Sequence, residues 1–309
     1  MAEEPAVIQI FRLIFETLKV LILIQYETLK AIFYFFISPA PKDVVDEIVL
    51  ITGAGHGMGR EMALRFARLG AIVICADINE TSNKETLLMI KEEKGRAYKY
   101  ECDVRKREAV FALAEKIKKD VGDVTILVNN AGIMPCKPFL RQSEQEIKTM
   151  MELNVNAYLW TIQAFLPAMI EKNYGHIVSM SSMAGLLGIR NLVPYCASKY
   201  AVRGLMHALT VELHDDPRDT NGIKLTTIYP YIVDTGLCQK PRIKFKSLLK
   251  VISPGEAADT IVDAVRRNYS EICTPTHMYY SNKFLTGLLP VGALLVLSDY
   301  LDTGVDAHE

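Results

Sequence analysis

Tyr195 and Lys199 stand four residues apart in the run Tyr-Cys-Ala-Ser-Lys. In a helix this spacing places both side chains on one face, one turn apart. An ammonium beside a phenol favours the phenolate, so we expect Lys199 to lower the pKa of Tyr195 from its ordinary value of about 10 and to make it a usable general base. The spacing alone is common on surface helices. Ser182, at the end of a predicted strand, makes the joint arrangement hard to obtain by chance.

A glycine-rich turn indicates a second kind of chemistry. The run TGAGHGMG at 52–59 lies between a predicted strand and a predicted helix. Glycines let such a turn close tightly and let backbone N–H groups approach a pyrophosphate at the positive end of the helix. This context predicts a dinucleotide site.

Asp77 ends the next predicted strand and bears on the choice of dinucleotide. Its carboxylate can accept hydrogen bonds from ribose hydroxyls and would repel a 2′-phosphate, which favours NAD over NADP. His56 beside the phosphates is a contrary hint, although a histidine is mostly neutral at pH 7. The alternative role for Asp77 is that of a helix N-cap.

These residues need elements to position them, and from residue 46 onward short apolar strands alternate with helices. Strands are expected at 47–53, 71–77, 98–103, 124–132, 175–182, 223–230 and 271–275, and helices at 57–70, 85–95, 105–120, 144–171, 195–213 and 254–267. Such alternation means βαβ units. We therefore predict an α/β fold with a Rossmann-type, doubly wound parallel sheet of about seven strands.

The N-terminus carries the apolar excess of the chain. Residues 6–37 are predicted to form one helix, which the run SPAPK at 38–42 ends. Its charged residues fall within one narrow arc, where opposite signs can pair, and they are Arg12, Glu16, Lys19, Glu27 and Lys30. We expect an anchor helix lying in a membrane interface. The alternatives are packing on its own protein and a tilted span. A second apolar run, 284–297, could add a membrane contact.

Composition excludes several classes of protein. The chain has 309 residues, of which 50% are hydrophobic and 23% charged, so it can bury a large core. Its 35 basic and 36 acidic residues argue against nucleic acid as a partner. The six cysteines form no CxxC pair and no cluster with histidine, which predicts a reducing compartment and no metal site.

The chain resembles the short-chain dehydrogenase/reductase superfamily over roughly residues 46–275. The motifs that carry the resemblance are TGAGHGMG at 52–59, Asp77, CDV at 102–104, NNAG at 129–132, LNVNA at 153–157, VSMSSMAG at 178–185, YCASK at 195–199 and PYIVDT at 230–235. Tyr231 stands where most members carry glycine, a departure that concerns the local loop rather than the chemistry.

The resemblance implies a role for each matching residue. Tyr195 would be the general acid and base, and Lys199 would tune it and bind the nicotinamide ribose. Ser182 would donate to the substrate oxygen, and Asn154 would serve a water relay. The implied cofactor-binding residues are Gly53, Gly55, His56, Gly57, Met58, Gly59, Asp77, Asp103, Val104, Asn130, Ala131, Gly132, Tyr195, Lys199, Pro230, Val233 and Thr235.

One branch is more similar still. The runs KKDVGDVTILVNNAG, FLPAMIEKNYGHIV and PYCASK resemble the membrane-associated 17-beta-hydroxysteroid dehydrogenases and epidermal retinol dehydrogenases. This implies NAD-dependent interconversion of a lipophilic alcohol, of the retinol or 17-beta-hydroxysteroid class, and its carbonyl. It also implies a location on the endoplasmic reticulum membrane or a lipid droplet, with the catalytic domain facing the cytosol. A carbonyl reductase of keto-lipids and a catalytically silent lipid-surface scaffold are the alternatives.

The expected organisation has three parts. They are a membrane-anchor segment and linker at 1–42, an NAD-binding catalytic domain at 43–275 and a C-terminal apolar extension at 276–309, with a homodimer as the expected assembly. The substrate pocket is expected from the loops 133–143, 184–194 and 236–252. In the last loop Lys240, Arg242, Lys244 and Lys246 alternate with apolar residues, and Leu248 and Leu249 follow. We hypothesise that this segment, a mobile lid by resemblance, contacts an anionic membrane surface, and the alternative is a solvated flexible loop.

Overall fold

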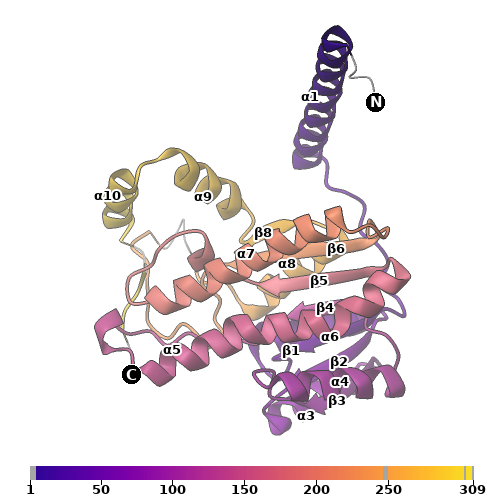
Figure 1. Cartoon of the computed structure of the whole chain (residues 1–309). Helices are drawn as coiled ribbons and strands as arrows, with labels where there is room; N and C mark the ends of the chain where they lie inside the picture. Colours follow the sequence, from indigo (N-terminus) through magenta and orange to yellow (C-terminus); the bar gives the residue numbers. More distant parts are fainter. Residues whose placement is uncertain (1–4, 246–249, 303, 308–309) are drawn as a thin grey trace. The chain divides into compact units, whose positions relative to one another are not determined.

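A computed structural model of the protein describes residues 5–245, 250–302 and 304–307 (Figure 1). The chain divides into two compact units, Met1–Lys42 and Asp43–Glu309.

Seven parallel strands form the central sheet of the larger unit, in the order β3-β2-β1-β4-β5-β6-β8. They are β1 (Ile48–Thr52), β2 (Ile72–Asp77), β3 (Arg96–Glu101), β4 (Ile126–Asn129), β5 (Gly175–Met180), β6 (Ile223–Pro230) and β8 (Glu271–Thr274). Every residue of β4 and β5 is buried, as expected for strands covered on both faces. The predicted Rossmann-type parallel sheet is confirmed, including its seven strands.

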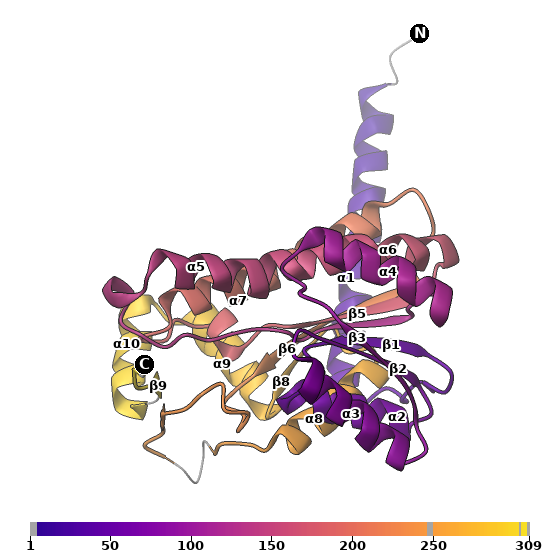
Figure 2. The same ribbon diagram turned by 90° about the horizontal axis from the view of Figure 1, so that it is seen from below.

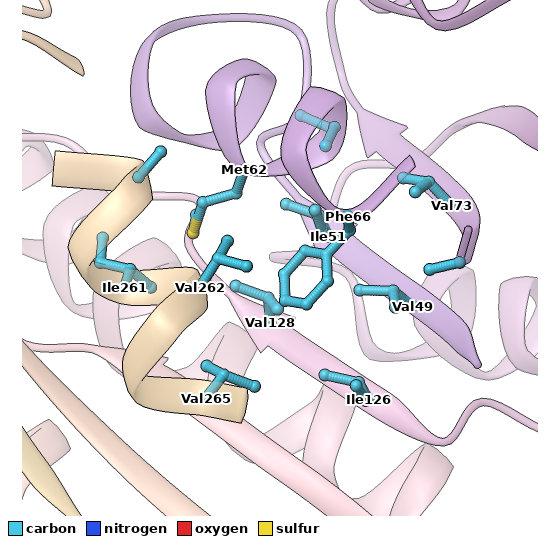
Figure 3. Packing of buried hydrophobic residues seen from close by; sticks show 14 of the residues in the cluster. Val49, Ile51, Met62, Phe66, Val73, Ile126, Val128, Ile261, Val262 and Val265 are labelled. Atoms are coloured by element: carbon cyan, nitrogen blue, oxygen red, sulfur yellow. The ribbon is translucent and has the colours of Figure 1, made fainter. Parts of the chain in front are cut away.

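Helices cover both faces of this sheet (Figure 2). They are α2 (Gly57–Arg68), α3 (Glu80–Glu92) and α8 (Pro254–Arg266) on one face, and α4 (Arg107–Asp120), α6 (Ala157–Lys172) and α7 (Val193–Asp215) on the other. On the first face Phe66 and Met62 of α2 pack with Val262 of α8 over strands β1 and β4 (Figure 3). This packing fixes the N-terminus of α2 at the end of β1.

The helix expected at 144–171 is interrupted. It consists of α5 (Glu144–Met151), a π-helical turn at Glu152–Asn156 and then α6. A capping box between Ser143 and Glu146 begins α5. The π turn contains Asn154, and such turns are frequent at functional sites.

The C-terminal part of the larger unit holds two helices, α9 (His277–Leu288) and α10 (Val291–Leu301), which are separated at Leu289 and Pro290. After α10 the short strand β9 (Gly304–Val305) pairs antiparallel with β7 (Pro241–Arg242). The sequence patterns did not predict this pair of strands.

The smaller unit contains α1 (Ala6–Phe36), which ends before Ser38 as predicted. No described residue of α1 is buried. Lys30 and Glu27 form an ion pair at 3.2 Å, one of the pairings expected along the charged arc. Within the described residues, no helix combines the length and apolar character that a membrane crossing requires.

Candidate active site

The predicted site segments meet at the carboxyl edge of the sheet. The glycine-rich turn follows β1, Asp77 ends β2, residues 130–132 follow β4, Ser182 follows β5 and Pro230 ends β6. The carboxyl ends of parallel strands share one edge, which is where open α/β sheets bind ligands.

The glycine-rich turn is closed too tightly for side chains. A Cβ at Gly59 would lie 2.1 Å from the carbonyl oxygen of Gly53, which itself has a left-handed φ of 66°. Asn130 Nδ2 donates to the carbonyl oxygens of Thr52 and Gly53 at 2.9 and 3.2 Å. Thr52 Oγ1 accepts from the backbone N–H groups of Asn130 and Ala131 at 3.0 and 3.2 Å. The loop after β4 therefore holds the turn in place.

The N-terminus of α2 opens on a cavity of about 430 Å³, which is lined by His56, Gly57, Arg60, Glu61, Asp234, Thr235, Gly236 and Pro254. The N-cap residue His56 makes no side-chain hydrogen bond to the helix, so no N-cap side chain satisfies the first N–H groups of α2. A Cβ at Gly57 would lie 3.0 Å from Thr235 Cγ2, so the loop after β6 closely approaches the turn. Uncapped N–H groups at a positive helix end beside a cavity fit a pyrophosphate.

Asp77 lies against this turn. Its Oδ2 accepts the Gly55 N–H at 2.9 Å, and its Oδ1 accepts the Asn79 N–H at 2.8 Å. The alternative role as a helix N-cap is wrong, because Asn79 caps α3. The neighbouring Arg60 pairs with Glu85 at 2.8 Å.

Asp103 and Val104 lie just beyond β3. The Asp103 carboxylate pairs with Arg105 at 2.8 Å, and this hydrogen-bonded partner lowers the pKa of Asp103. The Val104 side chain is buried in the core cluster under α4 and α6. The side chains of both residues therefore make contacts within the protein.

Tyr195 and Lys199 are buried on one face of α7. Lys199 Nζ lies 5.6 Å from the centre of the Tyr195 ring and donates to the carbonyl oxygen of Met180 at 2.8 Å. Burial lowers the pKa of Lys199 to about 7 and raises the pKa of Tyr195 to about 12, while a hydrogen bond with Ser182 partly offsets the latter shift. The expected lowering of the Tyr195 pKa is wrong for the protein alone, because removal from water disfavours the charged form of each group.

Asn154 is fully buried beside this pair. Its amide exchanges two hydrogen bonds with the backbone of Ile133, each 2.9 Å long, and donates to Ser198 Oγ at 3.2 Å. A Cβ at Gly132 would lie 3.1 Å from Asn154 Oδ1 and 3.7 Å from Lys199 Nζ. Lys199 and Asn154 therefore both approach Gly132.

Ser182 caps the short turn Met183–Gly185. Its Oγ accepts the Ala184 N–H at 3.1 Å and donates to the carbonyl oxygen of Pro230 at 3.5 Å. The loop after β5, the π turn and α7 thus bring together the four residues with implied catalytic roles, Ser182, Asn154, Tyr195 and Lys199.

The loop after β6 stays ordered despite the tyrosine at 231. The Tyr231 N–H donates to the carbonyl oxygen of Thr274 at 2.9 Å, which extends the pairing of β6 with β8 by one residue. Val233 forms a parallel bridge with Ile252 and packs against Met58 of the glycine-rich turn. Among the described residues, the buried Tyr231 hydroxyl has no hydrogen-bond partner.

Apolar side chains surround the phenol. The cluster that contains Tyr195 also contains Leu192 and Val305, with Ile133, Met134, Ile189 and Cys238 half-buried against it. The sequence patterns missed Val305, because nothing in a C-terminal tail indicates contact with a helix more than 100 residues earlier. Groups of three or more His, Cys, Asp or Glu side chains suited to a metal ion are absent from the described ranges.

Two basic side chains of the segment after Thr235 have partners within the protein, so the alternative of a wholly solvated loop is wrong for them, and contact with a membrane surface stays a prediction. Arg242 pairs with Asp302 at 3.0 Å, and Lys244 Nζ donates to the carbonyl oxygen of Tyr300 at 2.9 Å. Lys246, Leu248 and Leu249 lie outside the described residues.

Comparison with known proteins agrees with this geometry. The sequence profile of the family described as short chain dehydrogenase matches residues 47–244. Epidermal retinol dehydrogenase 2 of Mus musculus is 40% identical over 274 residues, which cover 88% of each chain. Retinol dehydrogenase 10-B of Xenopus laevis is 36% identical over 293 residues, covering 86% of this chain and 85% of the relative.

The fold also matches a solved structure. A short chain dehydrogenase/reductase from Burkholderia phymatum, crystallised in complex with NAD, superposes with a TM-score of 0.70 at 24% identity. The match covers 78% of this chain and 93% of that one.

Proposed function

The chain belongs to the short-chain dehydrogenase family, in its retinol dehydrogenase branch, and we propose that it is an NAD-dependent oxidoreductase that interconverts a lipophilic alcohol of the retinol class and its carbonyl. Membership in this family makes the chain an alcohol oxidoreductase. The observation that carries the proposal is the convergence of Tyr195, Ser182, Lys199 and Asn154 beside a glycine-rich turn that fits a pyrophosphate.

In the proposed mechanism Tyr195, as a phenolate, takes the proton of the alcohol. Ser182, which is hydrogen-bonded to this phenol, holds the alcohol oxygen next to it. Lys199 and Asn154, which both approach Gly132, then relay this proton from the phenol to water. Because burial raises the pKa of Tyr195, removal of the proton needs a positive charge close to the phenol.

The dinucleotide would be held by the chain's own backbone and side chains. The turn residues from Gly53 to Gly59, with His56 and Met58, would hold the pyrophosphate, and Asp77 the adenosine ribose. Asp103 and Val104 would contact the adenine, residues 130–132 and Pro230 would line the site, and Val233 and Thr235 would hold the carboxamide. When bound, an oxidised nicotinamide supplies the hydride acceptor and a positive charge.

The proposed preference for NAD over NADP rests on the groups around Asp77. A 2′-phosphate placed beside this carboxylate would be repelled. Arg60, the nearby cation, is engaged with Glu85 and with the carbonyl oxygen of Gly55. It is therefore not free to neutralise such a phosphate.

The apolar wall around Tyr195 supports a lipophilic substrate. We favour retinol because two relatives that align over most of the chain bear the name retinol dehydrogenase. Three alternatives must be separated from this proposal by experiment. They are oxidation of a 17-beta-hydroxysteroid, reduction of a keto-lipid, and a scaffold protein without catalytic activity.

The test is turnover by the purified full-length protein. We expect NADH to form from NAD with all-trans-retinol, and more slowly with estradiol. With NADP as the cofactor, little NADPH should form. Tyr195→Phe should abolish turnover while NAD still binds, and Tyr200→Phe, an exposed tyrosine of the same helix, should keep the wild-type rate. Absence of turnover with every alcohol and ketone would favour the scaffold.

Membrane association is part of the proposal. All described residues of α1 are exposed and most are apolar, which suits a helix lying in a lipid interface with its charged arc outward. We propose that residues 1–42 anchor the protein to the endoplasmic reticulum or to lipid droplets, that 43–275 form the catalytic domain facing the cytosol with 276–309 as its extension, and that the protein is a homodimer.

A further inference from the structure

The C-terminal segment of the chain touches each of the three loops that were expected to form the substrate pocket. Cys136 Sγ donates to the carbonyl oxygen of Asp306 at 3.6 Å, and Asn191 Nδ2 donates to that of Val305 at 3.0 Å. The Asp306 N–H in turn donates to the carbonyl oxygen of Lys240 at 3.0 Å. One segment therefore links the loops 133–143, 184–194 and 236–252.

An ion-pair cluster fixes this segment. The Arg242 guanidinium lies 3.0 Å from Asp302 and 3.6 Å from Asp306. Asp302 ends α10 and has a left-handed backbone, while Asp306 lies just beyond β9. Arg242, on strand β7, thus pairs with one carboxylate that precedes strand β9 and with one that follows it.

The segment also contributes an apolar side chain to the surroundings of the phenol. Val305 is only 6% exposed and belongs to the cluster of Tyr195 and Leu192. Cys136, which lies under the segment, is 1% exposed. Displacement of the segment would therefore open the apolar wall and expose this thiol.

We propose that residues 304–307 form a strap that closes the apolar substrate site, and that Arg242 is its positioning residue. The strap joins loops that would otherwise move separately, so it stabilises the contacts that hold a long apolar substrate. A small alcohol gains little from these contacts. The selectivity for long substrates rests on the proposed function, whereas the closure of the strap does not.

The first test measures whether the strap is closed and does not depend on enzyme activity. Alkylation of Cys136 by iodoacetamide is followed by mass spectrometry in the full-length protein. Arg242→Gln and Asp302→Asn should each speed labelling by about threefold to tenfold, and the double variant should add little more, because both break one cluster. Arg218→Gln, which breaks a surface pair with Asp216, should leave the rate unchanged. Wild-type rates in both strap variants would overturn the proposal.

Added salt provides the same test without a substitution. Partly exposed ion pairs weaken as ionic strength rises. Labelling of Cys136 should therefore quicken with salt in the wild-type protein and not in Arg242→Gln. An equal response in both proteins would count against the strap.

The second test measures the selectivity for long apolar alcohols over small ones. Arg242→Gln should raise KM for all-trans-retinol about threefold to tenfold with little change in kcat, and should leave KM for cyclohexanol and the affinity for NAD unchanged. An equal rise for both alcohols would refute selection by the strap. If the wild-type protein oxidises neither alcohol, the proposed function fails, and labelling of Cys136 alone decides the strap.

Discussion

Burial opposes the charged forms of the two side chains that would move the proton. Tyr195 is held as a neutral phenol with its pKa near 12, and the pKa of Lys199 falls to about 7. Burial of this pair therefore lowers the stability of the folded protein, as is common at active sites. The sequence predicted that these residues meet, but not the sign of the shift for Tyr195, because a four-residue spacing carries no information on burial.

Lys199→Met should make stability less dependent on pH. The folded pKa of Lys199, about 7, lies below the unfolded value of about 10.4. Between these values the unfolded chain binds the extra proton, so this lysine makes wild-type stability rise with pH. Replacement by methionine removes that rise. We expect the difference in unfolding free energy, variant minus wild type, to fall by about 2–4 kcal/mol between pH 7 and pH 10.

Chemical denaturation at several pH values measures this difference. Lys116→Met on helix α4 serves as a control, since it removes an amine from another helix of the same unit. A difference for Lys199→Met that does not vary with pH would show that the amine stays charged in the folded protein.

Asp77→Ala should change the choice of cofactor. Removal of the carboxylate deletes the acceptor proposed for the ribose hydroxyls and the charge that repels a 2′-phosphate. We expect the affinity for NAD to fall about tenfold and that for NADP to rise, as measured by fluorescence titration. Asp103→Ala, at the other predicted adenosine contact, should weaken both cofactors alike. Equal wild-type affinities for NAD and NADP would contradict the role of Asp77.

At the scale of elements, the alternation of strands and helices was enough to predict the sheet, because each strand is a short apolar run bounded by a turn. Two features escaped that reasoning. The π turn at 152–156 needs one extra residue in a helical repeat, which periodicity does not register. Strands β7 and β9 have two residues each, too short for any alternation to be visible.

The approach of α2 to β1 yields a prediction at this scale. Gly59→Ala would place a Cβ 2.1 Å from Gly53 O, so the helix must move away from the strand. We expect loss of NAD binding and a destabilisation of about 2–4 kcal/mol. Gly204→Ala, inside α7 where no described residue beyond the adjacent helix backbone comes within 4 Å of the added Cβ, should instead stabilise the protein by about 0.5–1 kcal/mol. Isothermal titration and thermal unfolding measure both effects. A Gly59→Ala protein that binds NAD normally would refute the tight turn.

At the scale of the whole molecule, motifs located the candidate site, but the apolar wall beside it depends on contacts between distant segments. Val305 joins the Tyr195 cluster through a tail whose sequence, rich in small and acidic residues, contains no signature. The sequence predicts a basic segment that includes Arg242 and Lys244, but it does not show which carboxylate or carbonyl oxygen each cation meets. Their partners lie at Asp302 and Tyr300, about 60 residues further along the chain.

The exposed helix α1 gives the prediction for the molecule as a whole. Ile14, Leu21 and Ile32 lie on the side of the helix opposite its charged arc, and each is at least half exposed. Burying such side chains in a lipid interface stabilises binding by about 1.5–3 kcal/mol each. Replacing all three by lysine should therefore release the full-length protein from vesicles in a flotation assay, as should removal of residues 1–42. Glu16→Gln with Glu27→Gln, on the charged arc, should leave binding intact. Flotation of the triple variant with the vesicles would show that another part of the chain, such as α9 and α10 with their exposed apolar side chains, holds the membrane.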